Sequence, residues 1–163
     1  MGLTAWAAYW FLPAVIPIAI FVSFSDMRRM KIPNIANDAL LIYYAIIGLI
    51  ALPFVDYLWH WSHFIVVLAA GILMNAVRLI GAGDAKFMAA AAPMVAYEDL
   101  RLIIVLLCAC LLAAYATHRL ARISPLRRMV PDWESWETGK KFPMGFPLSM
   151  SLLFYLLIVA IYR

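Results

Sequence analysis

Charged residues are scarce in this sequence of 163 residues, at 13% of the chain, whereas 67% of the residues are hydrophobic. A soluble domain contains about 25% charged and about 45–50% apolar residues. A soluble domain of this length could not hide so much apolar surface, because small domains leave much of their surface exposed. The composition therefore excludes a soluble enzyme, a disordered protein and a nucleic-acid-binding module. It indicates a protein that is surrounded by lipid.

Cysteine and histidine are also rare, with two and three residues respectively. Cys108 and Cys110 share one apolar run, and positions i and i+2 of a helix do not face each other, so the pair indicates packing. His60, His63 and His118 are expected in loops or at helix boundaries and form no cluster along the sequence. We therefore expect no metal site, no other cofactor and no Ser–His or Cys–His catalytic pair.

Long apolar runs dominate the rest of the sequence, and a membrane-spanning helix needs about 20 such residues. The fourth of six runs is short and rich in Ala, so it must pack inside the bundle, where small residues let helices approach closely. We expect an all-α integral membrane bundle of about six transmembrane helices, in one domain over residues 1–163, with a polar loop at about 119–142. The runs are Leu3–Phe24, Ala39–Val55, Phe64–Ile80, Phe87–Val95, Leu100–Thr117 and Leu148–Tyr162.

The Lys and Arg residues fall in alternate loops, which predicts the orientation of the bundle. Eleven of the 13 lie in the first, third and fifth connections, and only Arg101 and Arg163 lie on the opposite side. Because cytoplasmic loops carry the excess of Lys and Arg, we expect these three loops inside the cell and both termini outside. The eleven are Arg28, Arg29, Lys31, Arg78, Lys86, Arg119, Arg122, Arg127, Arg128, Lys140 and Lys141.

Two of the nine acidic residues, Asp26 and Asp84, are candidates for chemistry. Both lie where an apolar run meets a cytoplasmic loop, and ionisable groups near the membrane core favour a functional interpretation. Two carboxylates at one depth can share a proton, one acting as base and the other as acid. The alternatives are that Asp26 is a solvated partner of Arg28 or Arg29 and that Asp84 only caps a helix. Helix dipoles would make Asp84, at a helix start, the base and Asp26, near a helix end, the acid.

Three short motifs resemble those of one family of membrane proteases. Gly81-Ala82-Gly83-Asp84, followed by Lys86, resembles the GxGD motif of membrane aspartyl proteases. Asp26 with Ile32-Pro33-Asn34 resembles the first aspartate region of the type IV prepilin peptidase family. Pro143-Met144-Gly145-Phe146-Pro147 resembles the P-x-G-x-P stretch that opens the last helix of that family. The short chain is similar to the peptidase-only members that serve Flp-type, or tight-adherence, pili.

The resemblance implies a membrane aspartyl endopeptidase of the bacterial inner membrane, with Asp26 and Asp84 as the catalytic pair. Its substrates would be prepilins or pseudopilins, whose basic leader is cut after a glycine, ahead of a hydrophobic helix, at the cytoplasmic boundary. Its other partner would be membrane lipid, with no nucleic acid and no cofactor, and the sequence does not indicate an oligomeric state. Longer members carry a cysteine-containing insertion and also methylate the product. This chain lacks the insertion, so we expect cleavage without methylation.

Two further stretches carry expectations of their own. Pro143, Gly145 and Pro147 interrupt regular helix, so unpaired backbone there could line a cavity and bind an extended substrate; a rigid turn is the alternative. In the loop, residues 126–136 alternate apolar and charged side chains, which predicts a segment lying in the membrane interface with its Trp residues toward lipid. Other functions consistent with two membrane carboxylates are a different GxGD intramembrane protease, a proton-coupled carrier and a non-catalytic assembly subunit.

Overall fold

The computed structural model describes residues 2–137 and 142–163, and the described chain is helical with no strand. This confirms an all-α bundle. Five of its helices are long and apolar enough to cross a membrane. The helices are α1 (Ala5–Arg29), α2 (Asn34–Ala51), α3 (Phe54–Ala76), α4 (Ala82–Ala91), α5 (Leu100–Ile123) and α6 (Gly145–Tyr162), with 3₁₀ turns η1 (Ala92–Met94), η2 (Tyr97–Asp99), η3 (Pro125–Met129) and η4 (Glu134–Trp136).

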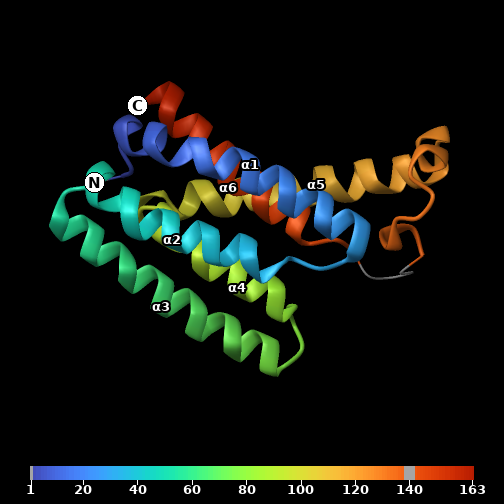
Figure 1. Ribbon diagram of the computed structural model, residues 1–163, viewed down its shortest axis with the longest axis horizontal. Coiled ribbons are helices and arrows are strands. Elements are labelled where there is room, and N and C mark those ends of the chain that lie inside the picture. Colours follow the sequence, from blue (N-terminus) through green and yellow to red (C-terminus); the bar gives the residue numbers. More distant parts are fainter. Residues whose placement is uncertain (1, 138–141) are drawn as a thin grey trace.

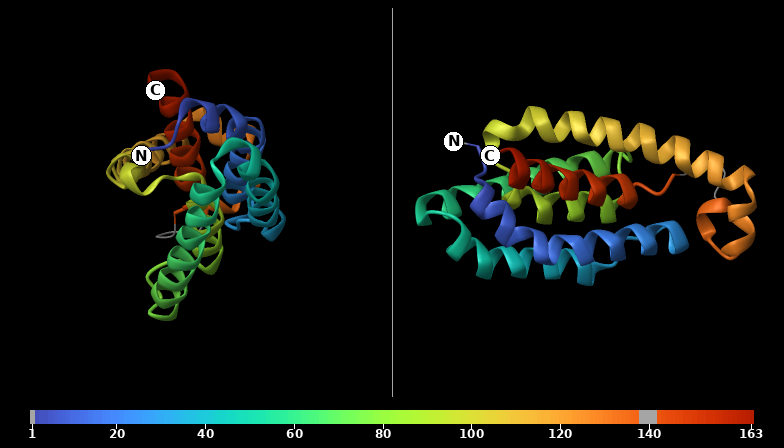
Figure 2. Two further views of the ribbon diagram at one scale, coloured as in Figure 1. Left: turned by 90° about the vertical axis from the view of Figure 1, so that its left-hand side faces the viewer. Right: turned by 90° about the horizontal axis from the view of Figure 1, so that it is seen from above.

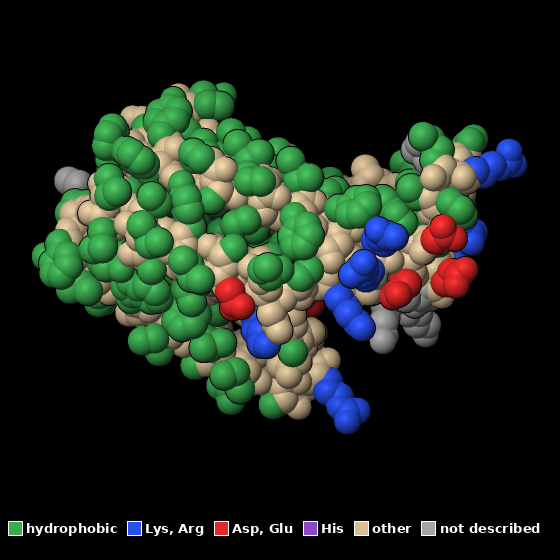
Figure 3. All heavy atoms as spheres, viewed as in Figure 1, with side chains coloured by type: hydrophobic (Ala, Val, Ile, Leu, Met, Phe, Trp, Pro, Cys, Tyr) green, Lys and Arg blue, Asp and Glu red, His purple; other side chains and the backbone are tan. Residues whose placement is uncertain are grey.

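The six α-helices run alternately up and down the bundle (Figure 1). Both ends of the described chain lie at one end of the bundle, and the α1–α2, α3–α4 and α5–α6 connections lie at the other. These three connections carry the Lys and Arg residues that define the expected cytoplasmic side, although Lys140 and Lys141 lie outside the described residues. We call this the inner end, and the end with the termini the outer end. Hydrophobic side chains cover the visible face of the body, whereas charged ones gather toward the inner end (Figure 3).

The core forms where α1 packs along α6, with α2 and α4 beside them. Phe11 of α1, Tyr44 of α2 and Tyr155 of α6 are fully buried there. Viewed along the bundle, α3 and α4 extend away from α1 and α6 as a wing (Figure 2, left). The wing leaves α3 mostly uncovered by protein, so most of its side chains face the lipid.

The helix bounds differ from the sequence-based ones most clearly in α3 and α4. The prediction that the third span begins at Phe64 is wrong, because α3 begins directly after Pro53 and so contains His60 and His63. The fourth segment is a helix of 10 residues followed by η1. Such a helix is about 15 Å long, which is about half the hydrocarbon thickness of a bilayer. The fourth segment therefore returns the chain across the bundle without one continuous spanning helix.

The irregular backbone after α4 is held by two histidines that sequence reasoning placed in loops. The ring Nδ1 of His60 donates to the Pro93 carbonyl at 2.8 Å, and that of His63 donates to the Val95 carbonyl at 3.0 Å. The two rings stack with their centroids 4.8 Å apart. Carbonyls at membrane depth need such partners, since no water replaces the missing helical hydrogen bonds. The stacked histidines thus fix the end of the short segment to α3.

The polar loop packs back on the bundle, so Trp136 is covered by protein and does not face lipid as expected. Trp136 is 2% exposed and stacks on His118 of α5, with centroids 4.9 Å apart. Trp133 stacks on Trp136 and meets the ring of Phe24 of α1 edge-on. The expectation failed because the spacing of apolar residues reveals a sheltered face but not whether lipid or protein shelters it. The loop also begins later than expected, because α5 continues to Ile123.

Candidate active site

Asp26 lies in the last turn of α1, where its side chain is only 4% exposed. The helix ends at Met30, whose backbone is left-handed (φ 51°) and whose N–H donates to the Asp26 carbonyl at 2.8 Å. The Ser25 hydroxyl donates to the Lys31 carbonyl at 3.1 Å and closes the turn that follows. These contacts fold the chain back sharply, so Asp26 points into the bundle at its inner end.

The backbone N–H of Gly145 donates to Oδ2 of Asp26 at 2.6 Å. Gly145 is the first residue of α6, so the carboxylate occupies the position of a cap at the N-terminus of that helix. A side chain at this position would not fit, because a Cβ on Gly145 would lie 3.0 Å from Asp26 Oδ2 and 2.8 Å from Cγ1 of Ile32. The glycine is therefore required for the close approach of α6 to Asp26.

The expectation that Pro143–Pro147 leaves its backbone irregular is wrong for its second half. Gly145, Phe146 and Pro147 form the first turn of a regular helix. Proline is tolerated there, because the first backbone N–H groups of a helix have no partner within it. The free N–H groups of this turn point toward the Asp26 carboxylate. The segment is therefore neither an open backbone edge for an extended substrate nor only a rigid turn, because it binds a side chain of the protein.

Asp84 lies in the first turn of α4 and is half-buried. Gly81 is the N-cap of the helix, and its backbone N–H donates to the Asp84 carboxylate, which reaches back as in a capping box. A Cβ on Gly81 would lie 2.7 Å from Asp84 Oδ2, so this glycine makes room for the carboxylate. Burial raises the pKa of Asp84 above its usual value of 3.8, and the Gly81 hydrogen bond opposes the shift.

The Ile32-Pro33-Asn34 segment lies between the two aspartates and brings the three motifs together. Ile32 faces both glycines, since a Cβ added to Gly145 would lie 2.8 Å from Ile32 Cγ1 and a Cβ added to Gly83 would lie 3.6 Å from Ile32 Cβ. Pro33 is the N-cap of α2, and Asn34 is its first residue. Lys86 Nζ donates to Asn34 Oδ1 at 3.2 Å. The residues of the three motifs thus lie at the inner end, in or directly beside the first or last turns of α1, α2, α4 and α6.

The two carboxylates lie on either side of Ile32, which faces Gly145 beside Asp26 and Gly83 next to Asp84, so two negative charges would repel each other here. Within the described residues neither forms an ion pair with a Lys or Arg side chain, so the alternative that Asp26 pairs with Arg28 or Arg29 fails. The proposed asymmetry between them also loses its basis, because both carboxylates lie at helix N-termini, Asp84 in α4 and Asp26 against α6. Two close acids without a counter-cation favour a state in which they share one proton.

Asn37 is a site residue that sequence reasoning missed. It lies one turn into α2 from Asn34, is 6% exposed, and neither its amide oxygen nor its amide nitrogen has a hydrogen-bond partner among the described residues. A buried amide without partners costs about 1–3 kcal/mol. Its position in an otherwise apolar stripe (Ala36, Leu40, Tyr44) was the available signal, since polar side chains inside membrane helices are unusual.

Comparison with known proteins gives the class of the molecule. Residues 13–117 match the type IV leader peptidase family. The chain belongs to this family, and it is a peptidase and a multi-pass membrane protein. The match contains Asp26, the Ile32-Pro33-Asn34 segment and Asp84, and it ends before Pro143. No curated protein and no solved structure matches the chain at a significant level.

Proposed function

We propose that this protein is an aspartyl endopeptidase that removes the basic leader of prepilins or pseudopilins. It acts at the cytoplasmic boundary of the bacterial inner membrane, and it is of the short, peptidase-only kind that serves tight-adherence pili. The observation that carries the proposal is that two carboxylates, Asp26 and Asp84, lie together at the inner end of the bundle, and neither forms an ion pair within residues 2–137 and 142–163. Membership of the leader peptidase family supports it.

The chemistry needs a base and an acid and no covalent intermediate. One ionised carboxylate takes a proton from water, and the resulting hydroxide attacks the scissile carbonyl carbon. The protonated partner gives its proton to the leaving amine as the C–N bond breaks. A pair that shares one proton supplies both groups at once. We expect the pair to act without a metal or other cofactor, and among the described residues no three His, Cys, Asp or Glu side chains gather.

The orientation follows from the basic connections. With Arg28, Arg29 and Lys31 in the cytoplasm, both ends of the chain are outside and the aspartates lie at the cytoplasmic face. Reporter fusions after Asp56 and after Asp99 should report outside, and one near Ser135 should report inside. The reversed pattern would place both aspartates on the wrong side for a cytoplasmic leader.

The activity is tested by co-expression with candidate prepilins and detection of a leader-sized mobility shift. Asp26→Asn and Asp84→Asn should each abolish the shift while the proteins still accumulate in membranes. Asp38→Asn is the matched control, because Asp38 is an exposed carboxylate in the first turns of α2. Processing retained by either of the first two variants would remove that residue from the catalytic role. Mass spectrometry of the mature N-terminus tests the expectation that cleavage occurs without methylation.

A further inference from the structure

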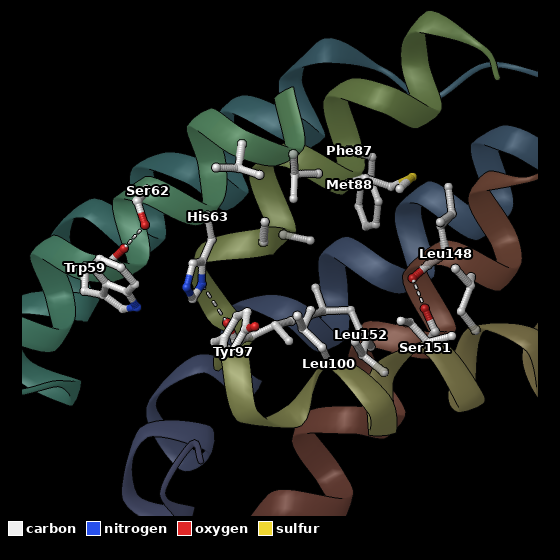
Figure 4. A pocket seen from close by; sticks show the side chains of 18 residues that line it. Trp59, Ser62, His63, Phe87, Met88, Tyr97, Leu100, Leu148, Ser151 and Leu152 are labelled. Carbon is white, nitrogen blue, oxygen red and sulfur yellow. Dashed lines mark hydrogen bonds between the residues drawn. The ribbon is translucent and has the colours of Figure 1, made fainter. Parts of the chain in front are cut away.

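A groove with a volume of about 470 Å³ opens between the α3–α4 wing and the α5–α6 side of the bundle (Figure 4). This volume is within the range of ligand pockets, about 300–1,000 Å³. Its walls include Val66 of α3, Phe87 and Ala91 of α4, Ile104 of α5, and Leu148 of α6. The groove is a hollow between two packed layers of helix, and so it is more than an exposed helix face.

The two serine hydroxyls that line the groove are occupied by backbone groups of the protein. The Ser62 hydroxyl donates to the Trp59 carbonyl at 2.6 Å, and the Ser151 hydroxyl donates to the Leu148 carbonyl at 2.8 Å (Figure 4). His63 Nδ1 donates to the Val95 carbonyl, whereas its Nε2 has no partner among the described residues, and most of the remaining lining is apolar. The groove therefore favours an occupant that is apolar and satisfies its own hydrogen bonds. At membrane depth these conditions are met by an α-helix or by a lipid acyl chain.

The groove begins one helical turn from the candidate active site. Phe87 follows Asp84 by three residues along α4, and Leu148 follows Gly145 by three residues along α6. The lining continues from Phe87 to Ala91 along α4 and then through η1 to Val95. A substrate whose scissile peptide bond lies at the aspartates, and whose chain then continues into the membrane, would enter this groove.

Small residues favour a helix over a lipid chain as the occupant. Ala91, Ala92 and Ser151 line the groove, and small residues allow the backbones of two helices to approach closely. The position of the groove directly beside the aspartates also favours a helix, because a helix in the groove would place the peptide bond before its first residues at the aspartates.

We propose that this groove binds, as a helix, the apolar membrane segment of the substrate that directly follows the scissile bond. The inference rests on the proposed peptidase function and adds the place where the product side of the substrate lies. In this proposal α3, α4, α5 and α6 bind the membrane helix of the substrate, and the basic leader lies at the cytoplasmic face.

The chain offers two matched pairs of positions to test the groove. Ile104 lines it, and the next residue, Val105, does not, although their side chains are 57% and 58% exposed. On the opposite wall Val66 lines it and Ile65 does not, with exposed fractions of 65% and 64%. Ile104→Trp and Val66→Trp fill the groove, whereas Val105→Trp and Ile65→Trp place the same ring in the membrane beside it.

The processing rates of these four variants in liposomes decide the question. The two groove-filling variants should lower kcat/KM for a full-length prepilin about tenfold or more, and the two control variants should match the wild type. A peptide that contains the leader and ends shortly after the scissile bond should be cleaved equally by all five proteins. Equal rates for groove and control variants on the full-length substrate, or an equal loss on the short peptide, would overturn the inference.

A photoreactive amino acid at position 104 gives a second measurement that does not depend on the rates. In Asp84→Asn protein it should crosslink to prepilin residues that follow the cleavage site, whereas the same group at position 105 should crosslink to lipid. Crosslinks from position 104 to lipid alone, with substrate present, would show that the groove holds an acyl chain and would contradict the proposal. If the wild type cleaves no prepilin, the proposed function fails and this inference fails with it; cleavage with insensitive groove variants overturns the groove alone.

Discussion

The two ends of the bundle each bury an aspartate, but the partners of the two carboxylates differ. At the outer end Asp99 is 3% exposed and accepts hydrogen bonds from the Leu3 N–H at 3.0 Å and the Tyr155 hydroxyl at 2.8 Å. Arg163 binds the same carboxylate with both terminal nitrogens of its guanidinium. At the inner end Asp26 is buried to a similar extent and has a backbone N–H donor and a second acid nearby, but no Lys or Arg of the described chain pairs with it.

The difference separates a structural carboxylate from a reactive one. Asp99 joins the start of the chain, the start of α5 and the end of α6, and its charge is matched by Arg163. A carboxylate that is fully paired in this way holds helices together, and its proton is not available for chemistry. Asp26 and Asp84 form no ion pair with any described residue, which is the condition under which two acids divide the tasks of base and acid.

The largest expected effect of a small substitution is at Gly145. Gly145→Ala places a Cβ 3.0 Å from Asp26 Oδ2 and 2.8 Å from Ile32. The carboxylate or α6 must shift, and displacement of a catalytic group by about 1 Å can cost about 100-fold in rate. We expect a loss of this order in prepilin processing.

Gly83→Ala is the control for Gly145→Ala. Its Cβ would meet Ile32 at 3.6 Å, an ordinary contact, and alanine suits a helical position. Activity near the wild-type level is expected even though this glycine belongs to the GxGD motif. If the two variants behaved alike, the close approach at Gly145 would not be what fixes Asp26.

The next effect in size concerns stability at the outer end. Asp99→Asn removes the charge that Arg163 binds and should lower the free energy of unfolding by about 2 kcal/mol, since hydrogen bonds to charged groups contribute about that much. Tyr155→Phe removes one donor to the same carboxylate and should cost about half as much. The melting temperature in detergent measures both. If Asp99→Asn melted at the wild-type temperature, the hydrogen bonds and ion pair of Asp99 would not contribute to the stability of the outer end.

A smaller effect of opposite sign is expected at Asn37. Asn37→Leu removes a buried amide that has no partner among the described residues, so the free energy of unfolding should rise by about 1 kcal/mol. Because that amide lies one turn from Asn34 at the inner end, prepilin processing should fall by a few-fold. A stabilised variant with full activity would show that the amide has no part in binding or positioning.

The smallest effect is expected at the exposed hydrogen bond between Lys86 and Asn34. Lys86→Met should change the free energy of unfolding by less than about 0.5 kcal/mol, because exposed polar pairs contribute little. Arg78→Met serves as the comparison, because Arg78 lies in the α3–α4 connection just before α4 and belongs to none of the three motifs. A large loss of stability in Lys86→Met alone would mean that this contact holds α2 against α4.

The features that the sequence predicted correctly are those that depend on local pattern. Apolar runs of bilayer length and basic residues in alternate connections predicted an all-helical bundle that alternates in direction. Asp26 and Asp84 could be selected because a carboxylate at the end of an apolar run is unusual, and the structure brings both to one end. Their pairing with the Ile32-Pro33-Asn34 segment, however, depends on Ile32 filling the space between Gly83 and Gly145, which no local pattern reveals.

The failures all involve contacts between distant parts of the chain. The stacked His60 and His63 lie inside α3 and bind carbonyls more than 30 residues away. Trp136 is sheltered by His118 of α5 and not by lipid. Asp26 caps α6 across 119 residues of sequence. The prediction that Asp26 is the acid considered only the dipole of α1, at whose end it lies, and not the dipole of α6, whose N-terminus its carboxylate contacts.

The most direct test of the contrast between the two ends measures processing per folded molecule for Asp26→Asn and Asp99→Asn side by side in liposomes. The account predicts that Asp26→Asn loses about 100-fold or more of the rate, as expected on removing half of an acid–base pair, and keeps a melting temperature near that of the wild type. It predicts that Asp99→Asn melts earlier but processes prepilin at the wild-type rate wherever it is folded. An Asp26→Asn protein that still processes prepilin, or an Asp99→Asn protein that is fully stable and inactive, would contradict it.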